Sequence, residues 1–135
     1  IHPLLPHDGS VVLYMLVRSA GGRPTGYPMT GMLRDGRLEI TTYRKAPKAK
    51  YLLADDRVCC VVHDPLQPAR GVAVYGHAVP ASAEGFVAST QSGEQAAISV
   101  PDEVKNTVRD RLETDKRMVF RIDVVRVEEV GDGQA

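Results

Sequence analysis

The sequence predicts a mainly β protein, a small antiparallel β-barrel of six or so strands with short flanking helices. Apolar runs rich in strand-forming residues recur along the chain, and turn residues separate them at short, regular intervals. Only two segments have helical spacing. Strands and helices do not alternate, which argues against a parallel doubly wound sheet. The 135 residues have the length of one domain, residues 1–135.

Three strands are predicted in the first third of the chain. The apolar run Val11–Val17 follows an N-terminal arm, residues 1–10, and ends at a Gly-Gly turn. The second strand, Tyr27–Leu33, leads into the Asp-Gly pair at 35–36, which is a strong hairpin signal. The third strand, 37–43, alternates between two faces. These faces carry Leu38, Ile40 and Thr42 on one side and Glu39, Thr41 and Tyr43 on the other.

A short helix and two further strands are predicted next. The helix covers Ala46–Ala54, with Pro47 in its first turn, where proline is favoured. The apolar run Arg57–His63 indicates a buried strand. After a loop with two prolines, Gly71–Pro80 alternates again and predicts another strand.

The C-terminal part of the chain is predicted to contain one helix and one long strand. The segment Pro101–Thr114 has a single narrow apolar stripe, which indicates a surface helix. The strand Met118–Val130 shifts its apolar phase between Val124 and Val125, and this shift predicts a β-bulge. Residues 131–135 form a frayed tail.

Charge and composition limit the classes of partner. Seventeen basic residues balance seventeen acidic ones, so the chain lacks the basic surplus of a dedicated nucleic-acid binder. No apolar run approaches 18 residues and no secretory leader is visible, so we expect a cytoplasmic protein without a membrane partner. The only cysteines, Cys59 and Cys60, are adjacent and point to opposite faces of a strand. We therefore expect them to stay reduced.

A run of cations at the start of the first helix is the most informative local feature. Four basic residues fall within seven positions of a neutral chain: Arg44, Lys45, Lys48 and Lys50. The start of a helix is already electropositive, so the run is favourable where an anion joins it. A phosphate could be bound by Lys48, Lys50 and the Thr41 and Thr42 hydroxyls. The alternative is a solvated basic turn, since charge runs are often only soluble surfaces.

Other catalytic signals are weak. The histidines do not have metal-ligand spacing, so no metal site is expected. Cys59 would need a base to act as a nucleophile, and His63 is the only local candidate. The sequence contains no nucleophile elbow, dinucleotide fingerprint or Walker loop. Its catalytic residues stay unknown, as in proteins whose cofactor carries the difficult chemistry.

The order of these features resembles the pyridoxamine 5'-phosphate oxidase-like split β-barrel family, including its flavin- and deazaflavin-dependent oxidoreductase branch. No single motif is highly specific, but their order and spacing together extend over roughly Val11–Glu128. The matching segments are Gly22–Pro24, Tyr27–Met29, Asp35–Thr42, Lys48–Leu52, Asp55–Val62, Val72–Ala78 and Val119–Ile122.

The resemblance implies a homodimer of split barrels with two cofactor sites in the grooves between the subunits. In the family, the end of the third strand contacts the ring or the ribityl chain of the cofactor. Thr41, Thr42 and Tyr43 occupy that place here. The basic residues of the following helix hold the phosphate in the family, and they match Lys48 and Lys50. The implied cofactor is FMN or the deazaflavin coenzyme F-420.

Three positions depart from the family pattern. Tyr51 stands where the family often has Asn, and Asp56 where it has Pro. The true oxidases have a Gln that reaches FMN where this chain has Gly71. Their C-terminal Arg and His substrate segment is also not visible. Vitamin B6 oxidase activity is therefore not expected.

Three functions follow from the resemblance. The first is an oxidoreductase in which the reduced cofactor delivers hydride to a small unsaturated, quinone-like or tetrapyrrole-type acceptor, with Tyr43 or Tyr14 as the proton donor. The second is a non-catalytic protein that binds a flavin, haem or another planar ligand. The third is a dimeric interaction domain that has lost its ligand.

Overall fold

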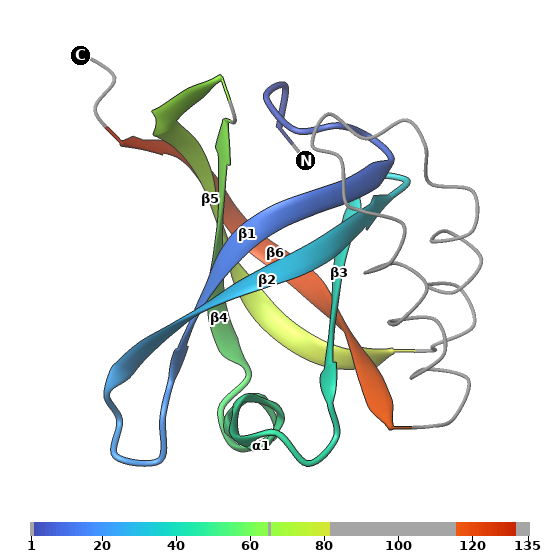
Figure 1. Cartoon of the computed structure of the whole chain (residues 1–135), viewed down its shortest axis with the longest axis vertical. Helices are drawn as coiled ribbons and strands as arrows, with labels where there is room; N and C mark the ends of the chain where they lie inside the picture. The colour runs from blue at the N-terminus through green and yellow to red at the C-terminus, as the bar shows by residue number, and fades with distance from the viewer. Residues whose placement is uncertain (1, 65, 82–115, 132–135) are drawn as a thin grey trace.

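A computed structural model, which describes residues 2–64, 66–81 and 116–131, contains a closed antiparallel barrel of six strands and one short helix (Figure 1). Neighbouring strands follow the order β1-β2-β3-β6-β5-β4, and β4 pairs with β1 to close the barrel. The predicted mainly β fold is confirmed. The elements are β1 (Gly9–Arg18), β2 (Pro24–Arg34), β3 (Arg37–Tyr43), α1 (Pro47–Ala54), β4 (Arg57–Asp64), β5 (Gln67–Ala81) and β6 (Arg117–Gly131).

The strands extend beyond the predicted apolar runs, because backbone pairing continues past them. β1 begins at Gly9, which pairs with Leu33 of β2, so the strand extends two residues into the predicted N-terminal arm. β5 begins at Gln67, within the segment predicted to be a loop. Gly131, the first residue of the predicted C-terminal tail, is instead the last residue of β6 and pairs with Arg70 of β5. The helix predicted over Pro101–Thr114 lies outside the described residues, as do residues 132–135 of the tail.

The predicted bulge in the last strand is confirmed. In the β5–β6 pair, Tyr75 lies opposite Arg126 and Gly76 lies opposite Val124. Val125 is therefore the extra residue and has no partner in the register. This changes which side chains of β6 face the interior on either side of position 125.

A tight turn sets the register of β2 and β3. Asp35 and Gly36 both have positive φ, 52° and 73°, as the turn of a two-residue hairpin requires. The Asp35 N–H donates a hydrogen bond to Asp8 Oδ1 at 2.9 Å, which ties the turn to the chain before β1. The turn therefore determines which β3 side chains face outward.

The core fills the barrel, and α1 covers one end of it (Figure 1). Inward-facing side chains of β1 include Leu13 and Met15, both fully buried. The short helix buries Ala49 and Leu52, and Leu52 packs into the same core. This packing fixes the position of the first helical turn next to the end of β3. Within the described ranges, no helix is long and apolar enough to cross a membrane.

Candidate functional site

The end of β3 presents alternate side chains to the outside of the barrel. Leu38 and Ile40 face the core, so Thr42 faces inward as well, while Thr41 and Tyr43 lie on the opposite face of the strand, where Thr41 is still buried and Tyr43 is exposed. Thr42 is 1% exposed, and its hydroxyl donates a 3.4 Å hydrogen bond to the Tyr43 carbonyl. Three β3 residues are predicted to contact the cofactor. The structure therefore places Thr41 and Tyr43 on one face of the strand and Thr42 on the other.

Arg117 at the start of β6 joins these two residues. It lies opposite Tyr43 in the register, and its guanidinium carbon is 4.4 Å from the centroid of the Tyr43 ring. Arg117 Nη1 donates a 2.7 Å hydrogen bond to Thr41 Oγ1. The sequence carries no local signal for this cation. Position 117 lies far along the chain from the basic run at 44–50. Only the pairing of β3 with β6 places Arg117 opposite Tyr43, next to the start of that run.

Lys48 of α1 brings a second cation to the same place. Its side chain is half-buried, and its Nζ lies 5.3 Å from the centroid of the Tyr27 ring. Burial lowers the pKa of Lys48, the positive charge of Arg117 lowers this pKa further, and Tyr43 opposes the shift. Desolvation is thus the main cause of the lowered Lys48 pKa, and the charge of Arg117 is the second.

Lys50 has a different environment from Lys48. It is exposed, and residues two apart in a helix do not share a face. Arg44 and Lys45 are also exposed, in the turn between β3 and α1. The structure therefore brings together Thr41, Tyr43 and Lys48 of the predicted set and leaves Lys50 on another side of the helix.

The first turn of α1 is favourable for an anion. It begins at Pro47, has no acidic residue in its first turn and has no side-chain cap at Ala46. Pro47 has no N–H, and the N–H groups of Ala49 and Lys50 already donate to the Ala46 carbonyl, so the attraction for negative charge comes mainly from the helix dipole. The start of this helix therefore supports the electropositive character of the cluster formed by Thr41, Tyr43, Lys48 and Arg117, which we call the cation cluster.

The thiols do not have the properties of nucleophiles. Cys60 lies in the core, and burial raises its pKa to about 12. Burial is also the main cause of a raised pKa for Cys59. A reactive cysteine requires a lowered pKa, so neither thiol is activated. Both are free, as expected from their adjacent positions.

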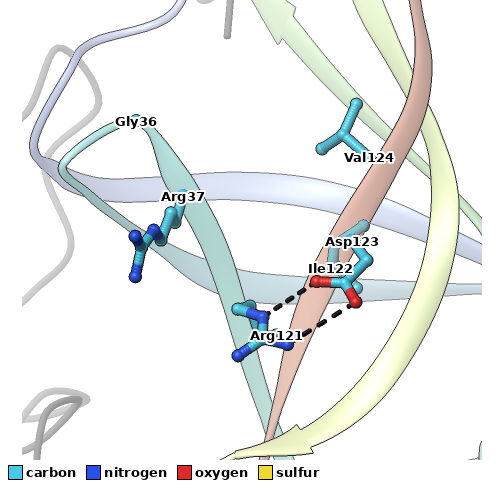
Figure 2. A pocket seen from close by; sticks show the side chains of 6 residues that line it. All are labelled: Gly36, Arg37, Arg121, Ile122, Asp123 and Val124. Atoms are coloured by element: carbon cyan, nitrogen blue, oxygen red, sulfur yellow. Dashed lines mark hydrogen bonds and ion pairs between the residues drawn. The ribbon is translucent and has the colours of Figure 1, made fainter.

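A shallow pocket of about 420 Å³ lies further along β3 and β6 (Figure 2). Its lining includes Arg37 at the start of β3 and Arg121 and Asp123 of β6. Arg121 Nε donates a 2.9 Å hydrogen bond to Asp123 Oδ1, so a carboxylate of the same strand balances this cation. Arg121 and Arg117 are four residues apart on one strand and share its outer face.

A group of three potential metal ligands lies at the hairpin turn. The ligand atoms of His7, Asp8 and Asp35 lie within 4.8 Å of one another, and all three residues are exposed. Asp8 already accepts the backbone hydrogen bond that ties down the turn. The proximity of these three side chains is thus explained by the hydrogen bond that joins Asp8 to the hairpin turn.

Comparison with known proteins finds similarity in structure only. No protein-family model matches the chain, and no curated protein matches it either. An F420 reductase is similar with a TM-score of 0.63 and 19% identity over 90% of this chain and 92% of that one. A candidate pyridoxamine 5'-phosphate oxidase from Listeria innocua has a TM-score of 0.61 and 14% identity over 88% and 87% of the two chains.

A third similar structure binds haem. It is a heme binding protein from Mycobacterium smegmatis, with a TM-score of 0.67 and 20% identity over 91% of this chain. The match covers 50% of that protein's chain. The chain therefore has the split-barrel fold that it shares with the F420 reductase and with pyridoxamine 5'-phosphate oxidase-like proteins, which confirms the resemblance predicted from its sequence.

Proposed function

We propose that this protein is an oxidoreductase that binds FMN or the deazaflavin coenzyme F-420 and transfers hydride to a small unsaturated or quinone-like acceptor. The observation that carries the proposal is the cation cluster. Arg117 of β6 contacts Tyr43 and donates a hydrogen bond to Thr41 at the end of β3, and its positive charge lowers the pKa of Lys48 in the helix that follows. The similar F420 reductase and pyridoxamine 5'-phosphate oxidase-like structures support an oxidoreductase at the level of the fold.

The residues present fit such a cofactor. Lys48 and the first turn of α1 would hold its phosphate, and Tyr43 would face the ribityl chain or the ring. Thr41 is 4% exposed, so its side chain would act by positioning Arg117 through their hydrogen bond. Thr42 would contribute through its backbone, since its side chain faces the core. Lys50 would add charge at the margin of the site. When bound, the flavin or deazaflavin ring supplies the hydride chemistry.

The side chains of the chain itself would orient the ligand and supply a proton. Of the two phenols considered as proton donors, Tyr43 belongs to the cation cluster and is 36% exposed. Tyr14 lies on β1, opposite Val61 of β4, with its ring centroid 6.3 Å from that of His63. We therefore favour Tyr43 as the donor.

A comparison of Lys48 and Lys50 tests the proposed binding mode. Lys48→Gln is expected to weaken FMN or F-420 binding about 10- to 100-fold, because a charge-assisted hydrogen bond contributes about 1.5–3 kcal/mol. Lys50→Gln, in the same helix but on another face, is expected to change the affinity less than about 3-fold. Both affinities are measured by titration with each cofactor, following ring fluorescence. Equal effects of the two substitutions would contradict the assignment.

A non-catalytic role in binding a planar ligand is the second candidate. The similarity to the heme binding protein favours it. The two functions differ in turnover. An enzyme reduces its bound cofactor with a donor and reoxidises it with an acceptor, whereas a carrier does neither. If the protein binds neither FMN, F-420 nor haem, the third possibility remains, a barrel that serves as a dimeric interaction domain.

We further propose that the protein is a homodimer and that the outer face of β1 belongs to the interface. Tyr14 and Leu16 are 50% and 41% exposed on that face, and two neighbouring large side chains of this kind on a strand are typical of a covered surface. Leu16→Asp is expected to convert the dimer to a monomer by light scattering after gel filtration, because it would bury an unpaired charge.

A surface leucine provides the control for the dimer experiment. Leu66 is 89% exposed, between β4 and β5, and Leu66→Asp should leave the mass unchanged. A wild-type protein that is monomeric at micromolar concentration would contradict the proposed dimer. A dimer that persists in the Leu16→Asp variant would show that the outer face of β1 is not part of the interface.

A further inference from the structure

β3 and β6 separate from each other toward the turn between β2 and β3. Their last paired residues in that direction are Glu39 and Arg121. Beyond this pair, within the described ranges, β3 pairs only with β2 and β6 only with β5. Each strand is held by its other neighbour, so the two diverge. The pocket of about 420 Å³ lies at this divergence, with residues 36–37 on one side and residues 121–124 on the other (Figure 2).

The pocket is separate from the cation cluster. Arg37 and Tyr43 are the first and last residues of β3, which places them about 20 Å apart along an extended strand. On β6, Arg121 lies about 13 Å along the strand from Arg117. The volume falls in the range of small-molecule sites, about 300–1,000 Å³. A small molecule would therefore fit here without contacting the residues of the cation cluster.

Arg37 brings an unbalanced positive charge to the pocket. Its side chain is exposed, and among the described residues it has no hydrogen bond or ion pair. Arg121 and Asp123 neutralise each other, through hydrogen bonds of 2.9 Å from Nε to Oδ1 and 3.5 Å from Nη2 to Oδ2. Their side chains are 39% and 53% exposed. The charged lining therefore carries one net positive charge, and a ligand can reach all three groups.

The carboxylate of Glu39 does not change this balance. Glu39 lies opposite Arg121 in the register, but its Oε1 accepts a 2.6 Å hydrogen bond from Arg34, and the two form a neutral pair outside the pocket lining. Asp123 is charged at neutral pH, since the hydrogen bond from Arg121 lowers its pKa. A dianion would bring its second charge close to this carboxylate. The lining is therefore suited to an anion with a single charge.

The rest of the lining is apolar or backbone. The Val124 side chain is 41% exposed and lies across the pocket from Arg37 (Figure 2). Ile122 is 3% exposed and packs in the core, so it offers the pocket mainly its backbone. Gly36 has no side chain to fill the space beside Arg37. One side of the pocket thus presents a charge, and the other presents an apolar surface.

We propose that this pocket binds a monocarboxylate that carries an apolar group. The Arg37 guanidinium would donate two parallel hydrogen bonds to the carboxylate, and the apolar group would lie against Val124. Asp123 would disfavour ligands with a second negative charge. The site is additional to the proposed cofactor site, and it does not depend on the flavin function.

A comparison of small ligands tests the chemistry of the site. The 135-residue chain is titrated with benzoate, pentanoate, acetate, benzamide and phenyl phosphate, following the backbone amide signals by NMR. Benzoate and pentanoate are expected to bind with a Kd of about 1 mM or lower and to shift the signals of residues 36–37 and 121–124. Acetate lacks the apolar group, benzamide lacks the charge, and phenyl phosphate carries a second charge. Each should bind at this pocket at least about 10-fold more weakly.

Substitutions test the residues of the site. Arg37→Gln is expected to weaken benzoate binding about 10- to 100-fold, and Arg37→Lys less, because lysine keeps the charge without the fork. Val124→Ser should weaken benzoate binding about 3- to 10-fold and leave acetate binding nearly unchanged. Arg23→Gln is the matched control. Arg23 is also exposed, in the turn between β1 and β2, and its side chain has no partner in the described part of the chain, so benzoate affinity should stay the same.

Three results would overturn the proposal. They are equal benzoate affinity of the wild type and Arg37→Gln, binding of phenyl phosphate at these residues as tight as that of benzoate, and no binding of benzoate or pentanoate up to about 10 mM. Repeating the titration with saturating FMN or F-420 separates the two sites. Unchanged benzoate affinity supports a separate pocket, and competition would show that benzoate occupies the cofactor site instead. If benzoate binds as expected and no flavin or F-420 binds, this pocket stands and the proposed function is wrong.

Discussion

Gly76→Ala is expected to destabilise the barrel by about 3 kcal/mol. A Cβ at position 76 would overlap the carbonyl oxygen of Asp123 and lie 2.9 Å from its carbonyl carbon and 3.1 Å from Val124 Cα. These are backbone atoms of the neighbouring strand next to the bulge, and they cannot move aside as a flexible side chain could. The free energy of unfolding from urea denaturation measures the effect.

A second glycine gives the control for this substitution. A Cβ at Gly21, in the turn between β1 and β2, would meet no atom within 4 Å. Gly21→Ala is therefore expected to change the free energy of unfolding by less than about 0.5 kcal/mol. If the two alanine variants are equally stable, the close approach of β5 and β6 at position 76 is not as described.

Phe120→Ala is expected to cost about 3–5 kcal/mol of stability. Phe120 is fully buried, is among the largest core side chains and lies opposite Ile40 in the β3–β6 pair. Removal of the ring leaves a cavity in the core beneath the paired strands β3 and β6. These two strands also carry Thr41 and Arg117. Where the variant folds, cofactor affinity should fall as well, although residue 120 faces away from the site.

Chemical denaturation and cofactor titration of the same samples check both parts of this prediction. Phe120→Leu fills most of the space, and we expect it to cost less than half as much as the alanine variant. Val125→Ala, at the 70% exposed bulge position, should have little effect. An alanine variant of residue 120 as stable as Val125→Ala would show that the ring is not part of the core.

Local patterns predict the strands of this fold well. The third strand matches the structure from Arg37 to Tyr43, because an Asp-Gly turn starts it and a strict alternation runs through it. The bulge was predicted from the change of apolar phase between Val124 and Val125. The ends of β1 and β5 were not predictable in this way, since backbone pairing there continues through glycine and polar residues that have no strand signal.

The candidate site was only partly predictable from the sequence. The run of cations indicated an anion site, but a list of basic residues does not separate Lys48 from Lys50. The difference arises from the helix face that packs next to Tyr27. Arg117 had no local signal, because its role follows from the β3–β6 register. The inward direction of Thr42 follows from the predicted alternation, although the site prediction grouped it with its outward-facing neighbours.

The pairing of β3 with β6 also has a consequence for folding kinetics. Arg117 and Thr41 are 76 positions apart in the chain and meet only when this pair of strands forms. Contacts of such long range are slow to form, since the entropy of closing a long loop is lost before the contacts compensate for it. The residues proposed to bind an anion are therefore assembled late, and the unfolded chain presents no such site. A ligand that binds them would recognise only the completed barrel, so it would add to the stability of the folded chain as its concentration rises above its Kd.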